Sequence, residues 1–235
     1  MTTASPPQTQ INSVITLYSN GRIKEALDSV ETLIKDYPNE ALLYNISGVC
    51  YKAIDKLDAA VESFEKALAI KPDYTETYNN LGFTFQGLGQ LDAAINCYKK
   101  AITLKPDYFV AHNNLGNAFK ELSQLDTAVK CYKKAITLKP DYTDAHYNLG
   151  NAFKELGQLD DAIKSYEQAL AIDPGYADAY NNLGVTLQEL DQLDAAVKCY
   201  EQAVVLKPDY IDAHNNLGVV LVQLGQLDDA VKCYK

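Results

Sequence analysis

The sequence predicts an all-α fold in which one helical hairpin is repeated about seven times, and three observations support this. Proline recurs every 34 residues, at positions 38, 72, 106, 140, 174 and 208. Midway between the prolines, a second series of turn-forming residues keeps the same spacing: Gly21, Asp55, Gly89, Ser123, Gly157, Asp191 and Gly225. Between these two kinds of stop, apolar residues follow the i, i+3, i+4, i+7 spacing of one helix face.

Each stop has a physical reason. Proline removes a backbone donor and disfavours helix for the residue before it, so every proline marks the end of a helix. Glycine tolerates the left-handed conformation that commonly closes a helix, and Asp and Ser adopt it less easily. Every unit is therefore predicted to hold two helices of about 12 to 14 residues, a normal length for a globular protein.

The unit that begins at Phe109 illustrates the packing. Its two apolar stripes are His112, Leu115, Gly116 and Phe119 in the first helix and Ala128, Tyr132, Ala135 and Ile136 in the second. The small residues Gly116 and Ala128 let the two helices approach closely. One such hairpin cannot bury its own apolar surface, so neighbouring units must stack into a solenoid.

This period, with aromatic-x-x-Leu-Gly-x-x-aromatic followed by Ala, Tyr or Phe, Ala and Pro, resembles the tetratricopeptide repeat. The resemblance implies a right-handed superhelix whose first helices line the concave wall. After a flexible tail at 1–6, a single solenoid at 7–235 would comprise the repeats 7–40, 41–74, 75–108, 109–142, 143–176, 177–210 and 211–235. The first repeat lacks Leu-Gly and is expected to be a degenerate cap. The last stops inside its second helix, so we expect a fragment of a longer chain.

Composition excludes several classes of protein. A net charge of −10 disfavours nucleic acid as a partner, because an acidic chain repels phosphates. No apolar run is long enough for membrane insertion, and the polar N-terminus lacks a secretory signal. The five cysteines have neither CxxC spacing nor nearby histidine partners, so we expect reduced thiols and a cytoplasmic location.

A row of asparagines is the candidate functional feature. One Asn precedes the Leu-Gly pair of five successive repeats, and we call these the rung asparagines: Asn80, Asn114, Asn148, Asn182 and Asn216. Their positions lie off the apolar stripe of the hairpin. An amide carries both donors and an acceptor, so it can pair with either group of a peptide backbone. Packed helices lie about 8–10 Å apart and an extended peptide rises about 3.3 Å per residue, so one rung could meet every third ligand residue.

This arrangement resembles the tetratricopeptide domain of the O-linked N-acetylglucosamine transferases, whose concave asparagines hold peptide backbones. The resemblance implies a peptide-binding groove. Further candidate contacts are the residues before the rungs, the residues one turn after two of them, and an acidic row: Asn79, Asn113, Tyr147, Asn181, Asn215, Asn117, Asn151, Asp144, Asp178 and Asp212. The acidic row favours neutral or basic segments. Alternatively, the asparagines are a repeat consensus that recent duplication has carried along.

No catalytic motif, metal-ligand cluster or cofactor loop is present in the sequence. The histidines His112, His146 and His214 occupy a slot that is Tyr in other repeats, so they are predicted to pack. We therefore expect a non-catalytic scaffold that needs no cofactor and binds an extended peptide or partner protein. The alternative is a substrate-recruiting arm of a larger glycosyltransferase or sulfotransferase with its catalytic part beyond residue 235. Self-association through the exposed C-terminal repeat face is a further expectation.

Overall fold

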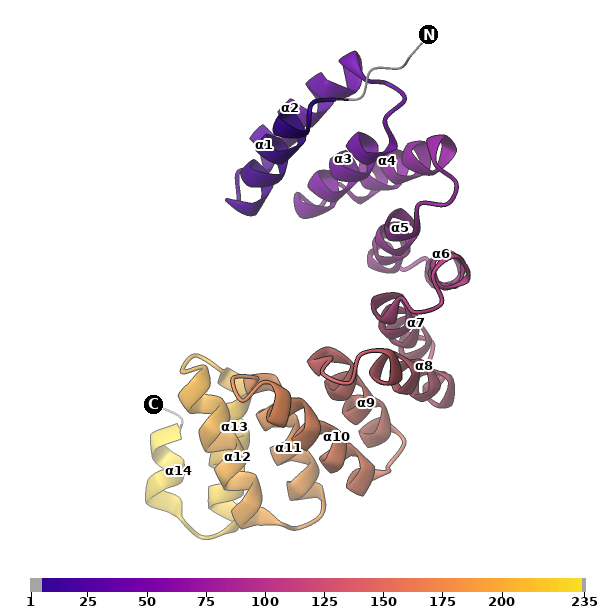
Figure 1. Cartoon of the computed structure of the whole chain (residues 1–235). Coiled ribbons are helices and arrows are strands. Elements are labelled where there is room, and N and C mark those ends of the chain that lie inside the picture. Colours follow the sequence, from indigo (N-terminus) through magenta and orange to yellow (C-terminus); the bar gives the residue numbers. More distant parts are fainter. Residues whose placement is uncertain (1–5, 234–235) are drawn as a thin grey trace. The chain divides into compact units, whose positions relative to one another are not determined.

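The computed structural model describes residues 6–233, which form fourteen α-helices and no strand (Figure 1). The predicted tail lies outside this range apart from Pro6, as do the last two residues of the predicted final repeat. The all-α hairpin repeat expected from the sequence is confirmed. The chain divides into two compact units, residues 1–118 and 119–235, and the division falls within α7 (Phe109–Glu121).

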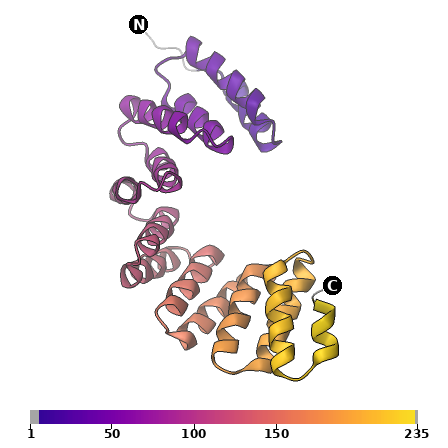
Figure 2. The ribbon, with the colours of Figure 1, turned by 180° about the vertical axis from the view of Figure 1, so that it is seen from behind.

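The first unit contains three helical hairpins and the beginning of α7. Its helices are α1 (Gln8–Ser19), α2 (Ile23–Asp36), α3 (Ala41–Ala53), α4 (Leu57–Ile70), α5 (Thr75–Gly87) and α6 (Leu91–Leu104). Odd and even helices pair as hairpins, and the second helix of one hairpin also packs against the first helix of the next (Figure 2). This double packing buries the apolar face that a single hairpin would leave open.

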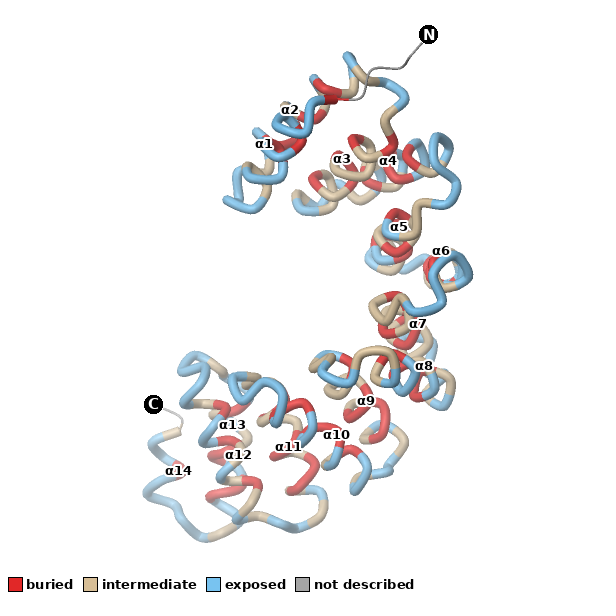
Figure 3. The backbone as a smooth tube through the Cα atoms, in the orientation of Figure 1, coloured by how far each residue is buried: buried red, intermediate tan, exposed pale blue. Residues whose placement is uncertain are grey.

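The second unit continues the same pattern after the end of α7. Its helices are α8 (Leu125–Leu138), α9 (Thr143–Glu155), α10 (Leu159–Ile172), α11 (Ala177–Glu189), α12 (Leu193–Leu206), α13 (Ile211–Gln223) and α14 (Leu227–Cys233). In Figure 3, the buried stretches of this unit lie where a helix faces its neighbours, whereas the connecting loops are largely exposed. The core of the unit is thus a continuous layer between first and second helices.

The first helix of each hairpin ends at a residue in the left-handed conformation, in the series from Gly21 to Gly225. All seven have positive φ, from 58° at Ser123 to 75° at Gly225. At Gly89, the N–H of Gln90 donates to the carbonyl of Phe85 at 2.9 Å and the N–H of Gly89 donates to that of Gln86 at 2.9 Å. These two bonds form the Schellman motif, which satisfies the last carbonyls of a helix.

A glycine in the first helix and an aromatic ring in the second form the centre of a hairpin. A Cβ added at Gly150 would lie 2.6 Å from the ring of Tyr166, and one added at Gly184 would lie 2.7 Å from the ring of Tyr200. Both rings are fully buried. Only glycine therefore permits this approach, which explains the Gly of these two Leu-Gly pairs.

Candidate functional site

The first helices form the inner layer of each unit. In the first unit α3 contacts α5, and in the second unit α9 contacts α11 and α11 contacts α13. Successive second helices make no comparable contact among the described residues. Because first helices meet each other and second helices spread apart, the surface over the first helices is the concave one within each unit.

In the first unit, the rung asparagines connect neighbouring repeats. Asn80 and Asn114 are half-buried. Nδ2 of Asn114 donates to Oδ1 of Asn79 at 3.0 Å, and Nδ2 of Asn80 donates to Oδ1 of Asn45 at 3.2 Å. Oδ1 of Asn45 also accepts a bond from Oγ1 of Thr77 at 3.0 Å. Each rung amide therefore hydrogen-bonds to the preceding hairpin while part of it stays open to solvent.

The second unit shows the same link at Asn216 and a denser network at Asn182. Nδ2 of Asn216 donates to Oδ1 of Asn181 at 3.0 Å. Nδ2 of Asn182 donates to Oη of Tyr147 at 3.0 Å and to Oδ1 of Asn151 at 2.9 Å. Oδ1 of Asn182 accepts from Nδ2 of Asn181 at 3.4 Å. This network uses every group of the Asn182 amide.

The remaining hydrogen-bonding capacity distinguishes the rungs from each other. A primary amide has two N–H donors and one carbonyl acceptor. Asn80, Asn114 and Asn216 each use one N–H, and their Oδ1 atoms accept no hydrogen bond from any described residue. These three amides can still donate once and accept, whereas Asn182 donates twice through Nδ2 and its Oδ1 already accepts once.

The residues that precede the rungs are mostly buried. Asn79, Asn113 and Asn181 are 7%, 3% and 6% exposed, so they leave little surface for a ligand. Tyr147 is half-buried and Asn215 is exposed. Sequence alone could not separate these positions from the rungs, because the boundary between the open and the covered side of the first helix is set by the neighbouring repeat.

The other predicted asparagines are half-buried. Asn117 and Asn148 belong to this class. Asn151 is committed to the network described above, because its Oδ1 accepts from Oη of Tyr166 at 2.7 Å in addition to the bond from Asn182. Burial is the main cause that raises the pKa of Tyr166. Asn151 thus satisfies a buried hydroxyl and positions a rung at the same time.

The acidic row remains accessible. Asp144 and Asp212 are exposed and Asp178 is half-buried. Burial, together with a hydrogen bond to Asp178, raises the pKa of Tyr210. The acidic side chains therefore lie at the first turns of α9, α11 and α13, where one of them already holds a tyrosine hydroxyl.

A pocket of about 360 Å³ lies beside Asn182, and it is lined by Lys120, Asn151, Lys154, Glu155 and Asn182. The ammonium of Lys120 lies 3.5 Å from the carboxylate of Glu155, and that of Lys154 lies 3.6 Å from that of Glu189. Neither lysine is among the site residues predicted from the sequence. The available signal was their position, since each follows an asparagine of the predicted site by three residues.

The histidines have a specific structural partner. Nε2 of His112 lies 3.1 Å from the carbonyl oxygen of Pro106, and the corresponding distance from His146 to Pro140 is 2.9 Å. His214 makes the same contact at 3.0 Å with the carbonyl of its own proline turn. The side chain in this slot therefore fixes the proline turn. Among residues 6–233, no group of three or more His, Cys, Asp or Glu side chains is placed to hold a metal ion.

Apolar side chains are exposed on the last two helices. Val222, Leu227 and Val231 are 50%, 60% and 53% exposed. Self-association through this surface stays a prediction. Over the part of the chain that the structure describes, no helix combines the length and the apolar character needed to cross a membrane.

Comparison with known protein families identifies the repeat. A family model described as TPR repeat matches residues 48–89, 87–123, 116–157, 150–191 and 189–225, well over half of the chain. The chain therefore belongs to the TPR repeat family, whose fold serves as a scaffold for protein–protein interaction and whose members are generally non-catalytic. In a search of curated proteins, no sequence matches the chain.

Several solved structures are similar. MamA is 30% identical with a TM-score of 0.63, and the match covers 68% of this chain and 94% of MamA. PilW, a widely conserved type IV pilus biogenesis factor, is 24% identical with a TM-score of 0.81, covering 91% of this chain and 97% of PilW. YrrB, a TPR protein with an unusual peptide-binding site, is 23% identical with a TM-score of 0.60. The match covers 78% of this chain and 95% of YrrB. The last two likenesses concern the fold alone.

Proposed function

We propose that this protein binds an extended segment of a partner protein over the first helices of its units, and that rung asparagines hold the main chain of that segment. The observation that supports the proposal is the spare hydrogen-bonding capacity of Asn80, Asn114 and Asn216. Each amide is half-buried, keeps one N–H and its Oδ1 unused by any described residue, and lies on a first helix.

The bond between repeats favours binding because it orients the amide beforehand. Ordering a free side chain at an interface costs about 0.5–1.5 kcal/mol, and this cost is reduced when the rotamer is already fixed. The Nδ2–Oδ1 bond from Asn114 to Asn79 fixes the rotamer in this way. The remaining N–H and carbonyl match the carbonyl and N–H of a peptide unit. Such main-chain pairing does not depend on the side chains of the ligand.

The partner that fits this surface best is neutral or basic. Exposed carboxylates stand at the first turns of α9 and α13, and the whole chain carries a net charge of −10. The resemblance to YrrB, itself a TPR protein with an unusual peptide-binding site, agrees with a peptide ligand. Among the described residues the five cysteines form no disulfide, which suits a reducing, cytoplasmic location.

The test uses a peptide selected on the wild-type protein from a random display library, with affinity measured by isothermal titration calorimetry. Copies of this peptide with single N-methyl groups remove one backbone N–H at a time and leave every side chain in place. Backbone holding predicts that N-methylation at about every third residue weakens binding by tenfold or more, since one rung meets the ligand at that interval.

The protein side of the test compares Asn80→Ala with Asn96→Ala. Asn96 is exposed on a second helix, so its replacement is a matched control. We expect weaker binding for Asn80→Ala and unchanged binding for Asn96→Ala. Tight binding of all N-methylated copies, combined with wild-type affinity of Asn80→Ala, would overturn the proposal.

A further inference from the structure

In the second unit, ion pairs join the last turns of successive first helices. The ammonium of Lys120 lies 3.5 Å from the carboxylate of Glu155, and that of Lys154 lies 3.6 Å from the carboxylate of Glu189. In both pairs the glutamate follows the lysine by 35 positions. Each repeat thus supplies the acidic partner for the lysine of the repeat before it.

The equivalent junction between α3 and α5, in the first unit, lacks the acidic residue. Lys52 occupies the lysine position in the last turn of α3, and the residue 35 positions later is Gly87. Among the described residues, no carboxylate lies within ion-pair distance of the Lys52 ammonium. The ammonium lies instead 4.5 Å from the ring centroid of Phe83 in α5. The ring attracts the cation, but the three N–H donors of the ammonium are still able to bind an anion.

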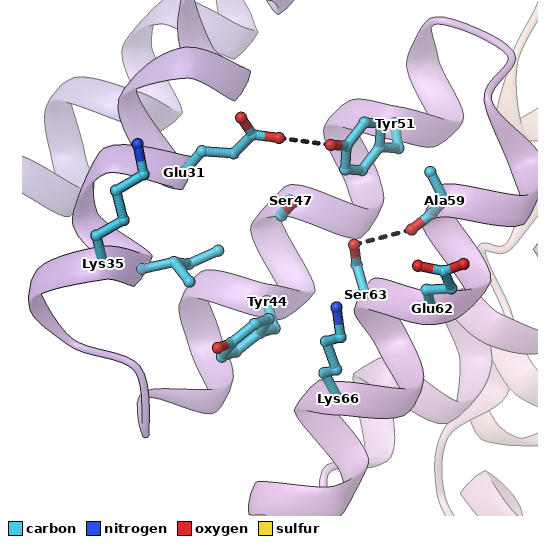
Figure 4. A pocket seen from close by; sticks show the side chains of 10 residues that line it. Glu31, Lys35, Tyr44, Ser47, Tyr51, Ala59, Glu62, Ser63 and Lys66 are labelled. Atoms are coloured by element: carbon cyan, nitrogen blue, oxygen red, sulfur yellow. Dashed lines mark hydrogen bonds between the residues drawn. The ribbon is translucent and has the colours of Figure 1, made fainter.

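Two carboxylates close to α3 are directed elsewhere. Glu31 of α2 accepts a hydrogen bond from Oη of Tyr51 at 2.5 Å, and together with Glu62 of α4 it borders the pocket between α2, α3 and α4 (Figure 4). Lys52 is half-buried, and burial lowers its pKa. A nearby carboxylate would favour the charged form, so this direction agrees with an ammonium that no acidic group compensates.

Lys52 and Phe83 continue the rung surface of the first unit. Lys52 follows Asn45 by seven residues, so both lie on one face of α3, about two turns apart. Phe83 follows the rung Asn80 by three residues, about 4.5 Å along α5. Nδ2 of Asn80 donates to Oδ1 of Asn45 at 3.2 Å, so the two faces adjoin. A segment held at Asn80 can therefore reach both side chains.

Phe83 supplies an exposed apolar surface beside this charge. Its side chain is 51% exposed, and the equivalent position in the next two repeats carries a polar residue, Asn117 or Asn151. We propose that an apolar side chain of the bound segment packs against Phe83, and that a neighbouring Glu or Asp of the segment pairs with Lys52 in place of the missing glutamate. This assignment rests on the proposed function and adds a sequence requirement that main-chain pairing lacks.

One acidic residue is compatible with a segment that is otherwise neutral or basic. The acidic row Asp144, Asp178 and Asp212 stands at the first turns of helices in the second unit. Lys52 stands in the last turn of α3, in the first unit. The two charge preferences therefore act on different residues of the bound segment.

The test uses the peptide selected on the wild-type protein, with acetylated and amidated ends so that every carboxylate belongs to a side chain. Isothermal titration calorimetry compares it with copies in which each Glu or Asp is replaced singly by Gln or Asn. One replacement should weaken binding by about tenfold, the size expected for a hydrogen bond to a charged group. The same replacement should have no effect on binding to Lys52→Met. A selected peptide without any acidic residue, or an equal loss with Lys52→Met, would overturn the proposal.

A matched pair of variants tests the site while keeping Lys52. Gly87→Glu supplies the acidic residue of the other junctions, and Gly87→Gln has the same shape without the charge. A Cβ at Gly87 would lie 3.4 Å from Cδ1 of Leu57, an ordinary contact, so both variants are expected to fold. Gly87→Glu should bind the peptide about tenfold more weakly than Gly87→Gln, because the ammonium is already paired. Equal affinity of the two variants would contradict the proposal.

Lys100→Met serves as a control for the loss of charge, because Lys100 is exposed on the second helix α6. It should respond to the peptide replacements like the wild-type protein. Failure of this inference is distinguishable from failure of the proposed function. Effects of N-methylation with equal affinity of the two Gly87 variants would retain main-chain holding and refute the acidic contact. A difference between the Gly87 variants without any effect of N-methylation would support the acidic contact and refute main-chain holding.

Discussion

Replacing Asn114 by Ala is expected to destabilise the protein, although alanine is the better helix former. Two effects oppose each other: the better helix propensity of alanine and the loss of a hydrogen bond between repeats. The substitution removes the 3.0 Å bond to Oδ1 of Asn79 and leaves that atom, on a side chain only 7% exposed, without its donor. From the sequence alone, the change would be expected to leave the fold intact or slightly stabilised.

The sizes of these two effects decide whether Asn114→Ala stabilises or destabilises the protein. A buried acceptor that loses its partner costs about 1–3 kcal/mol. The gain from Asn to Ala in a helix interior is at most about 0.7 kcal/mol. The difference predicts a net loss of about 0.3–2.3 kcal/mol in the free energy of unfolding.

Urea unfolding followed by circular dichroism measures this difference, with Asn96→Ala as the control. Asn96 is exposed within α6 and makes no side-chain hydrogen bond among the described residues, so only the propensity term remains and the control should be slightly more stable than wild type. If Asn114→Ala is stabilised as much as Asn96→Ala, the bond between repeats has no energetic role and the reasoning fails.

Three further predictions concern the core and the titrating groups. Gly150→Ala should lower the free energy of unfolding by about 1–3 kcal/mol, because its Cβ would overlap the ring of Tyr166, and urea unfolding that matches wild type would contradict this. The bond to Glu31 raises the pKa of Tyr51 from 10.0 to about 12, so its stabilisation is complete below pH 10 and is lost as the pH rises through 12. Tyr51→Phe should flatten that part of the alkaline stability profile. Burial raises the pKa of Cys97 to about 11, so its reaction with a thiol reagent near neutral pH should be slower than that of glutathione.

Much of the fold could be predicted because each repeat contains residues that mark the ends of its two helices. Pro38 and its five successors set one end of every unit, and the residues with positive φ set the other, so helix positions follow from local chemistry. The close contact of Gly150 with Tyr166 was likewise implied by a small residue opposite an aromatic one. These features depend on one hairpin alone.

The site was harder to predict because it depends on the neighbouring repeat. Asn113 and Asn114 are adjacent and chemically identical, yet one is 3% exposed and the other is half-buried. The bond of Asn182 to Tyr147 joins residues 35 apart, and no periodicity within one unit reports it. The alternative that the asparagines are only a repeat consensus now has a physical reason. A rung amide that hydrogen-bonds to the neighbouring repeat would be retained because it stabilises the fold. Binding and stability thus act on the same side chains.

Side-chain amide signals of the asparagines provide the most direct test of the central claim, which is that rung amides with unused groups hold a ligand backbone. They can be followed by nuclear magnetic resonance while the selected peptide is added. The account predicts that the Nδ2 signals of Asn80, Asn114 and Asn216 shift with the same saturation curve. The Nδ2 signals of Asn182, which already donates to Tyr147 and Asn151, and of the outer Asn96 should shift little. Peptide-induced shifts confined to second helices, with all three rung signals unmoved, would contradict it.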